Sequence, residues 1–176
     1  MHSIPVYCVA FVCSLTCAWL SECLRQRYLF ALFGALVTLI GLSIEIAQLD
    51  VVGARYAGMF FITAGTYITM PIMVVWTAIN VGKGYKRTVA FGLVIATGNA
   101  GALISSNVFI TKEAPKYPTG FSVGMGMNCL SIVCMTALYV GLRLENRRRN
   151  NRPADTVFEA SDELTGEKHP SWRYQL

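Results

Sequence analysis

The stretch from Arg55 to Tyr117 constrains the fold of this chain more than any other part. It contains two apolar runs of about twenty residues or more without an interior charge, joined by a short link with Lys83, Lys86 and Arg87. A helix that rises about 1.5 Å per residue needs about twenty residues to cross about 30 Å of hydrocarbon. The stretch is therefore predicted to be a helical hairpin that crosses a membrane twice.

Three further apolar runs extend this pattern. Of the 176 residues, 54% are hydrophobic and only 14% are charged, whereas about a quarter of the residues of soluble proteins are charged. The predicted fold class is all-α: a polytopic membrane helical bundle, residues 1–143, with five transmembrane helices at about 4–20, 28–48, 56–79, 88–110 and 120–142. Residues 144–176 are polar and are predicted to form a disordered cytoplasmic tail. The first run could instead be a cleaved signal peptide, but no Lys or Arg precedes it and four apolar runs follow.

The basic residues fall unevenly on the two sides of such a bundle. Twelve Lys and Arg lie in the first link, the third link and the tail, against three on the other side, which are Arg55, Lys112 and Lys116. Because basic loops stay in the cytoplasm, the amino terminus is expected outside and the carboxyl terminus inside, in the plasma membrane. The net charge of +5 does not gather on one patch, so no nucleic-acid partner is expected.

No catalytic or metal site is expected from the residue types that usually build one. Five of the six cysteines lie inside apolar runs without the paired short spacing of a zinc or thioredoxin site, and the two histidines lie near opposite ends of the chain. Paired carboxylates are also missing from the apolar runs. The chain is therefore not expected to be an enzyme, and no cofactor is implied.

Two polar residues near mid-membrane are the candidate substrate-binding residues, Tyr67 and Asn99. Polar groups at that depth are costly unless they face protein or a watery cavity. The amide of Asn99 needs up to four hydrogen-bond partners, which lipid does not supply. The alternatives are that Asn99 only holds two helices together and that Tyr67 is a packed aromatic residue with a bonded hydroxyl.

Several other residues carry structural expectations. Gly34 and Gly41 would allow close approach of a helix, as would small residues spaced along the run at 88–110. Pro71 would kink its helix and free a backbone carbonyl around Phe61 to Tyr67. Trp76 is expected to anchor its helix at the interface, and Glu45, near a helix end, is expected to be solvated, with proton coupling as the alternative.

Several short motifs occur in a characteristic order. They are Tyr-x-x-x-Pro, Trp-x-x-x-Asn, a glycine shortly before Lys-Arg, Gly-Asn-x-Gly and Pro-x-Tyr, carried by Tyr67, Pro71, Trp76, Asn80, Gly84, Lys86, Arg87, Gly98, Asn99, Gly101, Pro115 and Tyr117. This set resembles the tenth and eleventh helices of fungal major facilitator superfamily transporters, most closely the anion:cation symporters of the allantoate permease-like branch. The terminal Trp-Arg-Tyr resembles the aromatic-Arg-aromatic ending of the same transporters. The resemblance covers only their last five helices, a partial carboxyl-terminal half of the fold.

The same resemblance gives a role to the first charged link. There an acidic residue followed by arginines latches neighbouring helices together in one conformation of these transporters, which makes Glu22, Arg25 and Arg27 candidate latch residues. Cys23 departs from the pattern, since the family usually has a basic residue there. The alternative from the residues alone is that these charges only set the topology.

The resemblance implies transport of a small organic anion by proton symport in full-length relatives, with this chain truncated. The expected partners are the lipid bilayer, the anion, and either further copies of the chain or the missing transporter half. The alternative is a helical membrane protein that does not transport, acting as an assembly partner or an inactive fragment.

Overall fold

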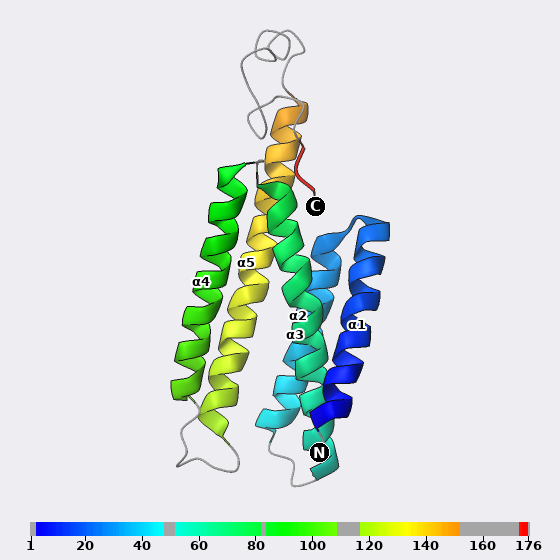
Figure 1. Ribbon diagram of the computed structural model, residues 1–176, viewed down its shortest axis with the longest axis vertical. Helices are drawn as coiled ribbons and strands as arrows, with labels where there is room; N and C mark the ends of the chain where they lie inside the picture. The colour runs from blue at the N-terminus through cyan, green and yellow to red at the C-terminus, as the bar shows by residue number, and fades with distance from the viewer. Residues whose placement is uncertain (1–2, 48–51, 82–83, 109–116, 152–172, 176) are drawn as a thin grey trace.

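Five helices make up the bundle (Figure 1). The computed structural model describes residues 3–47, 52–81, 84–108, 117–151 and 173–175. The helices are α1 (Ser3–Leu24), α2 (Arg27–Ile46), α3 (Val52–Asn80), α4 (Tyr85–Val108) and α5 (Pro118–Asn150). Each is long and apolar enough to cross a bilayer, and the described residues contain no strand. The predicted fold class, an all-α membrane bundle with five spanning helices, is therefore confirmed.

The helices run alternately up and down, so that the chain's links gather at two ends (Figure 1). We call one of these the basic end; it carries the α1–α2 link, the α3–α4 link and the last turn of α5 with Arg147, Arg148 and Arg149. The first turn of α1, the end of α2, the start of α3, the end of α4 and the start of α5 lie at the opposite end (Figure 1). Arg25, Arg27 and Arg87 also lie at the basic end, which the charge count predicts to face the cytoplasm.

Helices α2 and α3 form the centre of the bundle because glycines let them touch. A Cβ atom added to Gly65 would lie 2.5 Å from the carbonyl oxygen of Gly34, and one added to Gly41 would lie 2.7 Å from the backbone nitrogen of Ile62. Real Cβ atoms are not found at such distances, so only glycine fits at these positions. Helix α1 packs on α3, and α5 packs on α2.

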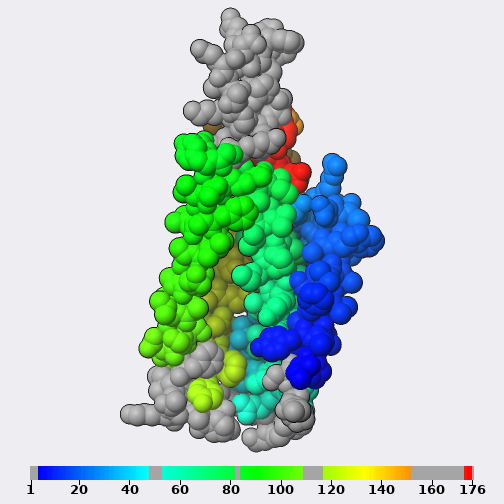
Figure 2. All heavy atoms as spheres, in the orientation of Figure 1, coloured from blue at the N-terminus to red at the C-terminus, as the bar shows by residue number. Residues whose placement is uncertain are grey.

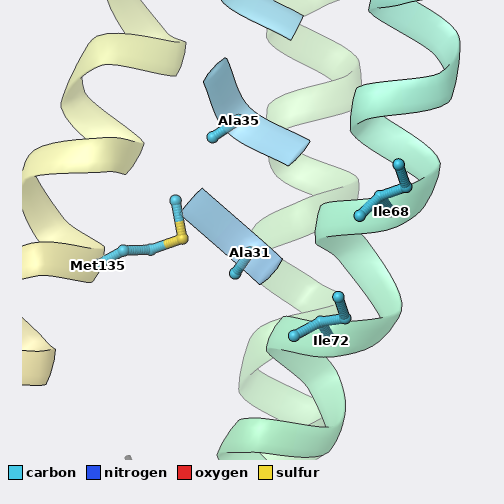
Figure 3. Packing of buried hydrophobic residues seen from close by; sticks show 5 residues of the cluster. All are labelled: Ala31, Ala35, Ile68, Ile72 and Met135. Carbon is cyan, nitrogen blue, oxygen red and sulfur yellow. The ribbon is translucent and has the colours of Figure 1, made fainter. Parts of the chain in front are cut away.

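The buried core lies at the α2–α3 contact and is completed by α5. Figure 3 shows its five residues, which come from α2, α3 and α5: Ala31, Ala35, Ile68, Ile72 and Met135. Helix α4 contributes nothing to this core and has no buried residue at all. It packs only at the side of the bundle, against α3 and α5.

Helix α5 is longer than the sequence prediction, since it continues to Asn150. Its extra turns place the carboxylate of Glu145 3.1 Å from the guanidinium of Arg149, one turn apart, and put arginines at the negative end of the helix dipole. The predicted tail therefore begins with helix up to residue 150. Residues 152–172 of that tail lie outside the described residues.

The orientation can be tested with single cysteines at the two ends of the bundle. In a background without the native cysteines, Gln26→Cys lies in the exposed α1–α2 link, and Ala47→Cys lies exposed at the opposite end of α2. A membrane-impermeant maleimide should label Ala47→Cys on intact cells and should label Gln26→Cys only after permeabilisation. The reverse pattern would show that the basic end faces outward.

Candidate functional site

Pro71 leaves one backbone carbonyl of α3 without its intrahelical partner. Proline has no N–H, so the carbonyl of Tyr67, four residues earlier, cannot accept the usual helical hydrogen bond. The hydroxyl of Ser14 on α1 donates to this oxygen at 2.8 Å. The polar defect in α3 is thus satisfied by a neighbouring helix, as bilayer-embedded backbone requires.

The side chain of Tyr67 lies on the α1 side of α3 and is 47% exposed. Its ring packs edge-to-face with the Tyr7 ring, with centroids 6.2 Å apart. Tyr7 in turn lines a cavity of about 410 Å³ between α1 and α3, together with residues that include Tyr56 and Thr63. Tyr67 therefore lies beside a cavity that carries several hydroxyl groups, without lining it.

Asn99 lies on α4 and is exposed. A second cavity, of about 450 Å³, is lined by residues of α2, α3, α4 and α5, among them Gly101, Ile104 and Val108. Figure 2 shows the surface hollowed between α3 and α4, with α5 at the floor. At 3.6 residues per turn, Asn99 is rotated about 200° from Gly101, so it lies on the opposite face of α4 from this cavity. The structure does not bring Tyr67 and Asn99 into one cavity.

Two of the three candidate latch residues lie together. Glu22 and Arg27 line one cavity of about 310 Å³, which also contacts Pro71 and Ile72 of α3. Arg25 faces a different cavity, next to Tyr28. The Nε atom of Arg27 is buried and has no hydrogen-bond partner among the described residues.

Glu45 is buried rather than solvated, which corrects the expectation from its position near a helix end. Its side chain is 0% exposed, and its Oε2 atom lies 3.6 Å from Nε of Arg55 on α3. Gly58 makes the room, because a Cβ atom there would lie 2.9 Å from Oε1 of Glu45. The Arg55 side chain is itself 30% exposed, so the cation lies at the edge of the bundle and the carboxylate inside it. This pair therefore ties the ends of α2 and α3 together.

A cluster at the basic end was not expected from sequence; in it, Asn80 and Asn146 bond to the backbone of Tyr174 and Gln175. The one sequence signal that could have indicated it is the position of Asn80 in the Trp-x-x-x-Asn motif. Within the described residues no group of His, Cys, Asp or Glu could hold a metal ion.

Comparison with known proteins gives the family context. No family model and no solved structure matches the chain. It is 27% identical to the high-affinity nicotinic acid transporter of Saccharomyces cerevisiae, over 99% of this chain and 33% of that protein. It is 31% identical to the MFS-type transporter cnsO of Penicillium expansum, over 98% of this chain and 35% of that protein. It is 30% identical to the major facilitator-type transporter hxnP of Emericella nidulans, over 96% of this chain and 35% of that protein.

The bond between Ser14 and Tyr67 predicts a coupling between two substitutions. Ser14→Ala should destabilise the bundle by about 1 kcal/mol, because it leaves the Tyr67 carbonyl unpaired. In a Pro71→Ala background the same substitution should cost much less, since the alanine supplies the missing backbone N–H. Both costs are measured as changes in the free energy of unfolding in mixed micelles of mild detergent and dodecyl sulfate.

Thr16→Ala is the matched control for this cycle, because the Thr16 hydroxyl bonds only to carbonyls of its own helix. An equal cost of Ser14→Ala with and without Pro71 would show that the serine does not serve the freed carbonyl.

The chain spans about a third of the length of the curated relatives it matches, and it aligns with them over nearly all of its own length. It is an integral multi-pass membrane protein, and its homologues are fungal transporters, several of them named as members of the major facilitator superfamily.

Proposed function

We propose that this chain forms part of a major facilitator transporter that moves a small organic anion by proton symport. The observation that carries the proposal is the alignment of 96–99% of the chain with transporters. The name of the yeast relative supports the substrate class, because nicotinic acid is a small carboxylic acid. The motif set from Tyr67 to Tyr117 supports the allantoate permease-like branch.

The exposed face of helix α4 favours a substrate pathway whose opposite wall is formed by protein outside these five helices. Asn99 is exposed on a helix without a buried residue, and an asparagine that faces lipid is costly. In transporters of this kind the substrate site lies between two sets of helices. We assign Asn99 to a wall of that site, with Tyr67 contributing from α3.

Glu22 and Arg27 support a latch at the basic end, which we place in the cytoplasm. Their shared cavity adjoins Pro71, and the guanidinium of Arg27 has a buried nitrogen without a partner in the described residues. An acidic group on an opposing helix would pair with Arg27 in one conformation and release it in the other. Arg25, which faces another cavity, contributes to the charge that sets the topology.

The second candidate is a helical membrane protein that does not transport. Its support is the geometry of the larger cavity, whose lining residues are nearly all apolar. An apolar cavity does not favour passage of an anion, so in this case the exposed face of α4 would bind an assembly partner or another copy of the chain.

A chimera distinguishes the proposed transporter from the membrane protein that does not transport. This chain replaces the matching third of the yeast nicotinic acid transporter, and uptake of labelled nicotinate and other small organic acids is measured in cells with and without a proton gradient. We expect gradient-dependent uptake that falls about tenfold or more in Asn99→Leu, as for the loss of one oriented polar contact to substrate.

Asn128→Leu is the matched control, because Asn128 donates to the Ala35 carbonyl between α5 and α2 and has a packing role. Surface amounts are equalised for all variants. A chimera at the cell surface without gradient-dependent uptake would favour the second candidate, and equal losses in Asn99→Leu and Asn128→Leu would reduce Asn99 to packing.

A further inference from the structure

Three residues near the carboxyl terminus, Arg173–Gln175, lie against the basic end of the bundle (Figure 1). The side-chain amide of Asn146 donates to the Tyr174 carbonyl at 2.9 Å and accepts from the Tyr174 N–H at 3.0 Å. The amide of Asn80 does the same for the next residue, donating to the Gln175 carbonyl at 3.1 Å and accepting from its N–H at 2.9 Å. Each asparagine thus pairs with both backbone groups of one residue.

This pairing places the segment between two helices. In an extended chain the N–H and C=O groups of successive residues point to opposite sides. The groups of Tyr174 face Asn146 on α5, and those of Gln175 face Asn80 on α3. The two side-chain amides therefore make the hydrogen bonds that neighbouring strands make in a β-sheet. The site recognises the backbone of the bound segment, as when a peptide adds a strand to a sheet.

Side chains add recognition of the residues that precede Gln175. The guanidinium of Arg173 donates to Oδ1 of Asn150 at 2.7 Å. The guanidinium of Arg149 lies 5.0 Å from the centre of the Tyr174 ring and donates to its hydroxyl at 3.3 Å. A cation over an aromatic ring is attracted to its face. An aromatic residue preceded by a basic one therefore suits this site.

Trp76 forms the floor of the site. Rather than anchoring α3 at an interface, it is buried, with 1% of its surface exposed, and its ring N–H donates to the Gln175 carbonyl at 2.8 Å. If the segment left, the buried indole N–H would lose this acceptor. This hydrogen bond therefore contributes to binding of the segment.

The segment also connects helices that scarcely touch. Within the described residues, α3 and α5 each pack against α2 and α4, with little or no direct packing between them. At the basic end, the described link between them is the pair of asparagines that hold Tyr174 and Gln175. Occupancy of the site therefore fixes the separation of the two helix ends.

We propose that Trp76, Asn80, Asn146 and Arg149 form a peptide-binding site whose occupant is the chain's own carboxyl-terminal segment, and that this segment is a releasable latch between α3 and α5. When the segment is bound, the basic ends of the two helices are held together; when it is released, they separate. The proposal does not depend on the substrate or on transport.

The test measures the distance between the two helix ends in the full chain reconstituted in lipid nanodiscs. Spin labels are placed at Val75→Cys on α3 and Arg147→Cys on α5, both exposed, in a background without the native cysteines. Pulsed electron paramagnetic resonance should give one narrow distance distribution. Gln175→Ala should leave this distance distribution unchanged, because the site binds the backbone. Gln175→Pro removes the N–H that donates to Oδ1 of Asn80. It should shift the distribution to longer distances, and the narrow peak should be lost.

A second pair of variants tests the bundle side of the site. Asn146→Leu should give the same shift as Gln175→Pro, while the control Asn107→Leu, whose amide bonds to its own helix at Leu103, should not. Unchanged distances in both Gln175→Pro and Asn146→Leu would overturn the proposal that the carboxyl-terminal segment holds α3 and α5 together. Equal shifts in Gln175→Ala and Gln175→Pro would overturn recognition through the backbone.

Discussion

The contact between α2 and α3 is the interaction on which the rest of this bundle depends. Lipid tails are as apolar as leucine side chains, so helices in a bilayer gain little from hiding apolar surface and associate where their backbones come close. Gly34, Gly41, Gly58 and Gly65 provide this approach. The other helices attach to the resulting pair, α1 through α3 and α5 through α2, and α4 stays at the side.

Three polar groups inside the bundle are paired with a group on another helix. Ser14 bonds to the carbonyl that Pro71 frees, Asn128 bonds to Ala35 between α5 and α2, and Glu45 pairs with Arg55. Each is a costly group in hydrocarbon that would be unpaired if its helix moved alone. These bonds join α1 to α3, α5 to α2 and α2 to α3, whereas α4 packs less extensively against the rest.

The helices themselves could be predicted because twenty apolar residues in a row have few other stable conformations in a membrane. The close approach at Gly34 and Gly41 was also expected from sequence. Small residues alone were a weaker guide on α4, where nothing lies within 4 Å of a Cβ atom added to Gly92 or Gly98. A glycine permits a contact, but the neighbour that makes it depends on the whole packing arrangement.

The polar contacts were harder to predict for the same reason. Glu45 looks solvated from its position in the chain, and only the glycine opposite it, Gly58, and the start of α3 with Arg55 make it buried. Asn80 and Asn146 are separated from Tyr174 and Gln175 by long stretches of chain, so no local pattern reveals that they bond. The roles of Tyr67, Asn99, Glu22, Arg25 and Arg27 remain proposals that depend on protein beyond these five helices.

The central claim is that the face of α4 with Asn99 lines a watery pathway rather than lipid. Leu103 and Ser106 share that face, being about one and two turns further along, whereas Leu93 lies on the flank of the helix. The most direct measurement is the reaction of single cysteines at these four positions with a small water-soluble thiol reagent, in membranes of cells that produce the protein. The account predicts reaction at positions 99, 103 and 106 and protection at 93. Protection at all four positions would show that this face meets lipid and would contradict the claim.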